Sequence, residues 1–114
     1  MATIFMLTKE PVRVTATGGQ DLRLAQEVGD FHELDVSYRL LEGSGTVSLK
    51  LETGMQTDST DGWVDLGSAF TGTAAPYATK QTITNPLRFV RWNLTNLGGG
   101  AGVTFLIQII GRTL

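Results

Sequence analysis

The chain has 114 residues, no cysteine and a formal net charge of -2 at pH 7. This length fits one domain with a modest core, and the lack of cysteine excludes disulfides, thiolate metal sites and cysteine nucleophiles. The near-neutral charge argues against direct nucleic-acid binding, and no stretch approaches the roughly 20 apolar residues of a membrane helix.

Charged residues are unevenly distributed along the chain. Residues 1–65 hold all 11 acidic residues and 5 basic ones, whereas residues 66–114 hold 4 basic residues and no acid. If early and late strands lie side by side in one domain, the two signs neutralise each other across the sheet. Alternatively, a subunit with one acidic and one basic region would attract its copies head to tail, which suits a repeated assembly.

The first residues form an apolar segment. Residues 2–8 read Ala-Thr-Ile-Phe-Met-Leu-Thr and reach Pro11 without a turn signal. Such a terminus is seldom left loose in water. We therefore divide the chain into an N-terminal arm or edge strand, residues 1–11, and a single β-sandwich domain, residues 12–114. The segment is expected either to complete its own sheet or to extend and add to a neighbour's sheet.

Three hairpins are predicted after this segment, because alternating apolar and polar residues are interrupted by glycine-containing turns. They join residues 12–16 to 21–26, residues 31–41 to 46–53, and residues 85–96 to 102–111. A short strand at 63–67 and a weaker one at 78–84 lie between the last two hairpins. Residues 68–77 are expected to form a surface connection.

The spacing of these segments indicates the fold class. About seven to nine short strands with a turn about every 8–12 residues are typical of an all-β protein with almost no helix. We predict a two-sheet antiparallel β-sandwich of Greek-key or jelly-roll type with an extended N-terminal arm. Alternate residues such as Glu52, Arg91 and Asn93 are predicted to face water. The predicted core consists of Leu34, Val36, Tyr38, Leu40, Val47, Leu49, Leu51, Val90, Trp92, Leu94, Phe105, Ile107 and Ile109.

No catalytic motif is recognisable. His32 is the only histidine; it lies at the start of a strand, and no nucleophile motif accompanies it. Asp58, Asp61 and Asp65 could supply oxygen ligands to calcium, but they miss the EF-hand spacing, and aspartate also builds ordinary turns. We therefore predict a protein that is not an enzyme and has no cofactor and no bound metal.

The aromatic residues suggest an alternative function. Trp63, Tyr77, Trp92 and Tyr38 could stack on sugar rings, as aromatic residues do in carbohydrate-binding modules. Because Trp92 and Tyr38 are predicted core residues, Trp63 and Tyr77 remain as the candidate glycan site. The alternative is therefore a carbohydrate-binding β-sandwich module.

One region of the chain, roughly residues 31–112, resembles small β-sandwich proteins of tailed-bacteriophage particles, such as head decoration or auxiliary capsid proteins. The resemblance lies in the order of Trp63-Val-Asp-Leu-Gly67, a polar strand, Leu87-Arg-Phe-Val-Arg-Trp92 and a closing strand at 105–112. The same order also resembles discoidin-type and other jelly-roll binding domains. The phage resemblance implies a non-enzymatic structural subunit of a virion, present in many copies.

The partners and location follow from that resemblance. They are copies of the chain itself and the major capsid or other virion proteins, in a particle assembled in the host cytoplasm. The lack of a signal peptide and of a cysteine framework fits cytoplasmic assembly.

The predicted contacts lie at the two ends of the chain. Leu106 and Ile110 alternate with core positions of the last strand, so they point away from the core. Together with the N-terminal segment they give more apolar surface than a small monomer usually exposes. The predicted oligomer or lattice contacts are Ile4, Phe5, Met6, Leu7, Leu106 and Ile110. Alternatively, the segment folds back over Leu106 and Ile110 within one subunit.

Overall fold

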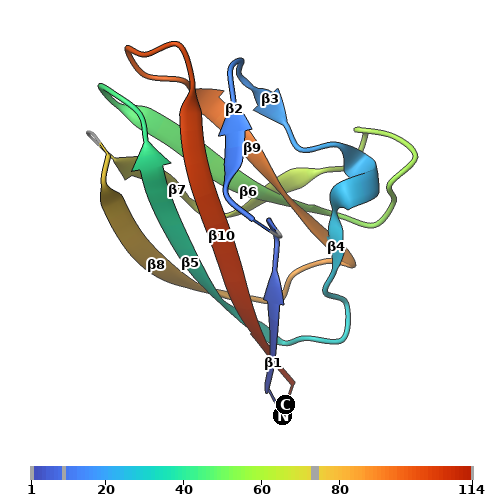
Figure 1. The fold of residues 1–114 in the computed structure, drawn as a ribbon. Coiled ribbons are helices and arrows are strands. Elements are labelled where there is room, and N and C mark those ends of the chain that lie inside the picture. The colour runs from blue at the N-terminus through green and yellow to red at the C-terminus, as the bar shows by residue number, and fades with distance from the viewer. Residues whose placement is uncertain (1, 9, 73–74, 114) are drawn as a thin grey trace.

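Two antiparallel sheets face each other in the structure, a computed structural model that describes residues 2–8, 10–72 and 75–113 (Figure 1). Sheet A consists of β1 (Ala2–Met6), β2 (Val12–Val14), β5 (Glu33–Glu42), β8 (Tyr77–Thr84) and β10 (Val103–Arg112). Its order is β1-β10-β5-β8, and β2 also pairs with β10.

Sheet B forms the opposite layer. It consists of β3 (Gly18–Gly19), β4 (Gln26–Glu27), β6 (Val47–Gly54), β7 (Val64–Gly72) and β9 (Phe89–Asn96). Its order is β3-β9-β6-β7, and β4 also pairs with β9. The predicted all-β, two-sheet antiparallel sandwich is therefore confirmed.

The core lies between the sheets, and every residue predicted for it is buried. Period-2 alternation made this prediction possible, because each long strand turns one face toward the opposite sheet. The Trp92 ring meets Phe105 edge-on, with a centroid distance of 5.0 Å, and Tyr38 stacks on Phe70 at 5.1 Å. The core also contains buried apolar residues that the alternation did not predict: Leu7, Val28, Leu66, Phe70 and Ile83.

All three predicted hairpins are wrong. β5 and β6 lie in different sheets, as do β9 and β10, so each of these connections crosses the sandwich. The first predicted hairpin is replaced by β2 on β10 and by a 3-10 turn, η1 (Leu22–Leu24), before β4. This turn is favoured because the Asp21 carboxylate accepts a hydrogen bond from the backbone N–H of Arg23 at 3.0 Å. Because these connections cross between the sheets, the long strands that they join contribute apolar faces to both layers.

The hairpin that does form joins β6 to β7 through residues 55–63. β7 continues to Gly72, so residues 68–72, predicted as a surface connection, belong to a strand. Gly67 has a positive φ of 71°, and the pairing register shifts between Leu49 and Leu51, which marks a bulge in the middle of this pair. Residues 73–74 lie outside the described part of the chain.

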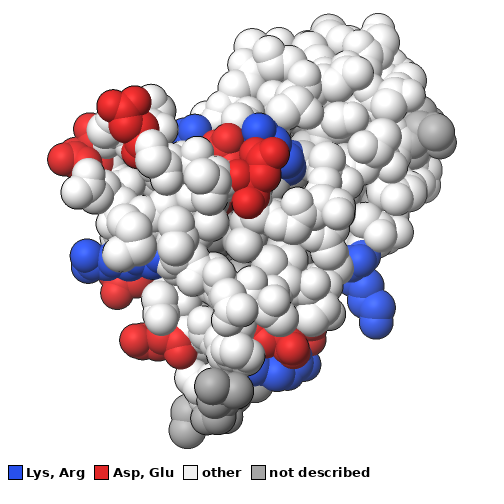
Figure 2. Space-filling model, turned by 180° about the vertical axis from the view of Figure 1, so that it is seen from behind, with Lys and Arg blue, Asp and Glu red and all other residues white. Residues whose placement is uncertain are grey.

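Basic residues of the second half lie next to acidic residues of the first half. Arg88 contacts Glu27 at 3.5 Å and Arg91 contacts Glu52 at 2.9 Å. Arg112 contacts Glu33 at 3.4 Å. Figure 2 shows acidic and basic side chains interspersed on one part of the surface, with a large uncharged region at the upper right. The uneven charge of the sequence is therefore neutralised between neighbouring strands, as the first of the two explanations expected.

Candidate interaction surface

β1 is an edge strand of sheet A and pairs with β10 in antiparallel register, with Ile4 opposite Ile110. The N-terminal segment therefore completes its own sheet in the single subunit and does not fold back over Leu106 and Ile110. Leu7 is buried, and the Phe5 ring stacks on Phe31 at 5.6 Å. These two predicted contact residues face the interior, while positions 1 and 9 lie outside the described residues.

The other predicted contacts lie on the outer face of sheet A. Ile4 is 75% exposed, and Leu106, Ile110 and Met6 are half-buried. Ile4 and Ile110 are direct cross-strand partners, as are Met6 and Gln108, so their side chains share one face. Leu106 is opposite Arg39 on β5, farther along β10. The structure therefore brings Ile4 and Ile110 together as partners, and it places Met6 opposite Gln108, which lies midway between Ile110 and Leu106 on β10.

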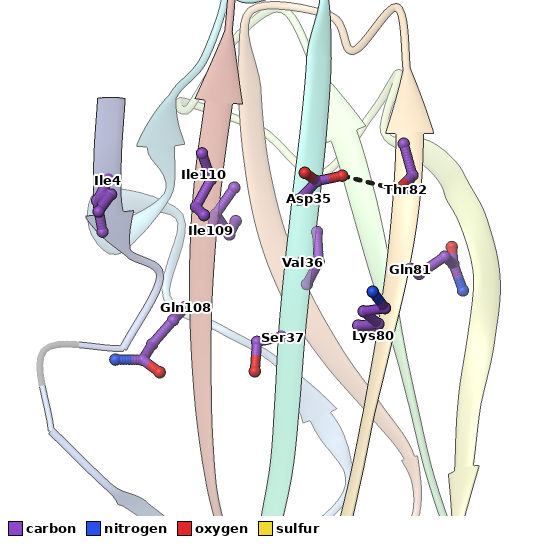
Figure 3. Close-up of a pocket in the computed structure, with 10 residues that line it drawn as sticks. All are labelled: Ile4, Asp35, Val36, Ser37, Lys80, Gln81, Thr82, Gln108, Ile109 and Ile110. Carbon is purple, nitrogen blue, oxygen red and sulfur yellow. Dashed lines mark hydrogen bonds between the residues drawn. The ribbon is translucent and has the colours of Figure 1, made fainter. Parts of the chain in front are cut away.

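A shallow groove of about 430 Å³ crosses this face (Figure 3). One row of side chains runs across the sheet as Ile4, Ile110, Asp35 and Thr82, and the next row contains Gln108, Ser37 and Lys80. The groove is thus apolar beside β1 and polar beside β8. We define the outer-face groove as the surface formed by these two rows.

The polar side of the groove is fixed by hydrogen bonds. The Asp35 carboxylate accepts a hydrogen bond from Thr82 Oγ1 at 2.7 Å and another from Arg112. The Thr82 bond, followed by the Arg112 guanidinium, lowers the pKa of Asp35 below its usual range. The hydrogen bond to Asp35 in turn raises the pKa of Arg112. The carboxylate therefore stays ionised and held in place at neutral pH.

Asp35→Asn is expected to reduce stability at pH 7 and to have less effect in acid. Because the folded-state pKa of Asp35 is lowered, its stabilisation is present above the unfolded pKa of about 3.9 and is lost as the pH falls through the folded value. Denaturant midpoints of both proteins between pH 7 and pH 2.5 measure this difference. A difference that stays constant down to pH 2.5 would contradict the assigned role of the carboxylate.

The predicted chemistry-bearing residues do not come together. His32 is exposed, and it contributes through its backbone: its N–H donates to the Arg112 carbonyl at 2.7 Å. Asp65 is bound by Lys50 Nζ at 2.8 Å, and the backbone N–H of Asp61 donates to Ser59 Oγ in a local turn. Within the described ranges, no group of three or more His, Cys, Asp and Glu side chains could hold a metal ion.

The candidate glycan residues do not form one platform. Trp63 Nε1 donates to two carbonyls of its own loop, and the Arg91 guanidinium lies over the ring at 5.2 Å. The ring also covers Gly54, where an added Cβ would lie 2.7 Å from it. Tyr77 begins β8 in sheet A, and its ring lies against Gly72, the last residue of β7, whereas Trp63 precedes the first residue of β7. The nine residues of β7, at about 3.3 Å each, therefore separate the two rings. Trp63 therefore packs onto its own sheet, sheet B.

A second hollow, of about 290 Å³, was not predicted from the sequence. It lies beside Trp92 and is bordered by Leu7, Val12 and Leu24. Gln20 supports it, because its side chain donates to the Leu7 carbonyl and accepts from the Trp92 backbone N–H. A glutamine between two turns carries no periodic signal that would have revealed this role.

The described residues contain no helix with the length and apolar character needed to cross a membrane.

The fold defines the chain as a small two-sheet β-sandwich protein. No protein-family model matches its sequence, and no curated protein sequence matches it. Among solved structures it is similar to the SPBc2 prophage-derived protein YomS, with a TM-score of 0.57 and 17% identity over 97% of this chain and 94% of that one.

A second similar structure belongs to Bacillus endospore appendages, described as a novel family of disulfide-linked pili. The TM-score is 0.52 and the identity 11%, over 100% of this chain and 92% of that one. At these identities the likeness concerns the fold alone. The disulfide linkage cannot be shared, because the chain has no cysteine.

Proposed function

We propose that the chain is a non-enzymatic structural subunit of a bacteriophage virion, and specifically a capsid decoration or auxiliary protein. The observation that carries this proposal is the apolar edge of sheet A. Ile4 is 75% exposed beside Ile110, at one end of the outer-face groove. An exposed apolar strip next to fixed polar groups is typical of a protein–protein contact.

The fold supports a role in an assembled particle. The two similar structures, one prophage-derived and one from pili, are matched over nearly their whole length, so the likeness extends beyond a fragment. The connections β5–β6, β7–β8, β8–β9 and β9–β10 all cross between the sheets. We infer a jelly roll from this order, an architecture found in viral capsid domains and also in lectin domains.

The proposed partners are further copies of the chain and the major capsid or another virion protein. The outer-face groove supplies the contact, and nucleic acid is not contacted directly. The location is the virion, after assembly in the host cytoplasm. Carbohydrate binding, the alternative from the sequence, is not supported by the separate positions of Trp63 and Tyr77.

Particles banded from a lysate of the cell that carries the gene should contain this protein. An antibody raised against the recombinant chain, together with quantitative mass spectrometry, should detect many copies per particle. Ile4→Asp should prevent incorporation, because it places a charge in the apolar strip. Val64→Asp is the matched control, since Val64 is also exposed, at 53%, but lies on sheet B. Absence of the wild-type chain from intact particles would refute the proposal.

A further inference from the structure

The edges of the two sheets differ in how they are protected against pairing with another strand. β8 exposes Lys80, β7 contains a bulge at Gly67, and β3 and β4 have only two residues each. Charges, bulges and short strands are the usual protections of an edge. β1 has five residues, Ala-Thr-Ile-Phe-Met, without a charge, proline or glycine. It is therefore the edge with no protection of this kind.

The hydrogen-bonding direction of each β1 residue follows from one bond to β10. The Leu7 N–H donates to the Ile107 carbonyl at 3.1 Å. Since alternate residues of an antiparallel strand direct their backbone groups to opposite sides, Thr3 and Phe5 also face β10. Ala2, Ile4 and Met6 then direct N–H and C=O away from it. In the described part of the chain, no strand lies on that side of β1.

We propose that β1 pairs with β1 of a second copy, antiparallel about a twofold axis at Ile4. This inference rests on the proposed function and names one of its contacts. In this register Ile4 opposes Ile4, and Ala2 of each copy opposes Met6 of the other. Each residue whose N–H and C=O point away from β10 therefore meets another such residue, so the edge is complementary to itself.

The side chains fit the same register. Directly opposed residues of antiparallel strands point to one face, and Ile4 is already opposite Ile110. The joined sheets would therefore carry a row of four isoleucines: Ile110 and Ile4 of one copy, then Ile4 and Ile110 of the other. β1 contains no charged residue, so no like charges meet across the axis. A partner with a charged edge strand would fit this surface less well.

The expected interaction is weak and reversible. Pairing five residues per copy buries less than the roughly 1,200 Å² of a stable specific interface. A dimer should therefore form with increasing concentration, and other contacts in a particle would strengthen it by multivalency.

Sedimentation equilibrium and residue-resolved hydrogen exchange test the proposal on the full chain. The dimer fraction should rise with concentration. The amides of Ile4 and Met6 should gain protection only in the dimer, whereas those of Phe5 and Leu7 should be protected throughout. Ile4→Pro removes an outward N–H and should weaken dimerisation at least tenfold, while Ile4→Val keeps that N–H and should dimerise as the wild type does.

Circular dichroism verifies that each variant is folded, and if Ile4→Pro is not, the exchange pattern of the wild-type chain decides. A chain that stays monomeric at all concentrations, or a dimer with unprotected Ile4 and Met6 amides, would overturn β1 pairing. Neither result would affect detection of the protein in particles, so failure of the pairing is distinguishable from failure of the proposed function.

Discussion

Trp92→Ala is expected to lower the free energy of unfolding by about 3–5 kcal/mol. The Trp92 side chain is 8% exposed, and its ring lies edge-on to Phe105 between the two sheets. Trp92 on β9 also pairs with Leu51 on β6, so its removal opens a cavity where both layers meet. Urea denaturation followed by circular dichroism measures the loss without depending on tryptophan fluorescence.

Two other variants sharpen this experiment. Trp92→Phe keeps an aromatic ring and removes Nε1, a buried donor without a hydrogen-bond partner among the described residues. It should therefore cost far less than Trp92→Ala. Leu24→Ala removes an apolar side chain that is 61% exposed and should change stability by less than about 0.5 kcal/mol. An equally small effect of Trp92→Ala would contradict the central position of the ring.

The core was predictable because alternation along a strand determines which residues face inward, whichever sheet the strand joins. On β5, Leu34, Val36, Tyr38 and Leu40 would be buried in a hairpin with β6 or in a crossing to the opposite sheet. The inward-facing positions are therefore set within each strand, and they can be predicted correctly even when the strand pairing is predicted wrongly. Tyr38 is fully buried, and this burial raises the pKa of its phenol to about 12.

Strand pairing was not predictable, because the lengths of the connections indicated the wrong strand pairs. Residues 43–46 and 97–102 are short and contain glycine, which favours hairpins, yet both connections cross between the sheets. The true hairpin has the longer connection, residues 55–63. Its polar residues do not indicate pairing, although in the folded loop Trp63 Nε1 donates to the Gln56 and Ser59 carbonyls.

The exposure of the proposed contact residues was predicted only in part. Alternation placed Ile110 on the outer face correctly, and the apolar terminus placed Ile4 at an exposed position. The apolar character of the terminus could not distinguish Ile4 from the inward-facing Phe5 and Leu7. A strand that pairs at a sheet edge still turns one of its faces inward. The position of Phe31, which receives the Phe5 ring, depends on a turn that carries no periodic pattern.

Glu52→Gln is expected to cost about 3–5 kcal/mol of stability, because it leaves the Arg91 charge buried without its carboxylate partner. Both side chains were predicted to face water, yet they are only 10% and 11% exposed. Trp63 covers Arg91, and Asn93 Nδ2 donates to Glu52 Oε2 at 3.3 Å. The outer face of sheet B therefore holds a desolvated ion pair under an aromatic side chain, and denaturation at pH 7 measures its loss.

Arg91→Met should cost less than Glu52→Gln, because Lys50 Nζ lies 3.6 Å from Glu52 and still compensates its charge. No comparable second acid contacts Arg91 among the described ion pairs. The double variant Glu52→Gln with Arg91→Met removes both charges and should lose less stability than the sum of the two single changes, as expected for a desolvated pair. If the losses of the single variants simply add in the double variant, then the pair is solvated and Trp63 does not shield it from water.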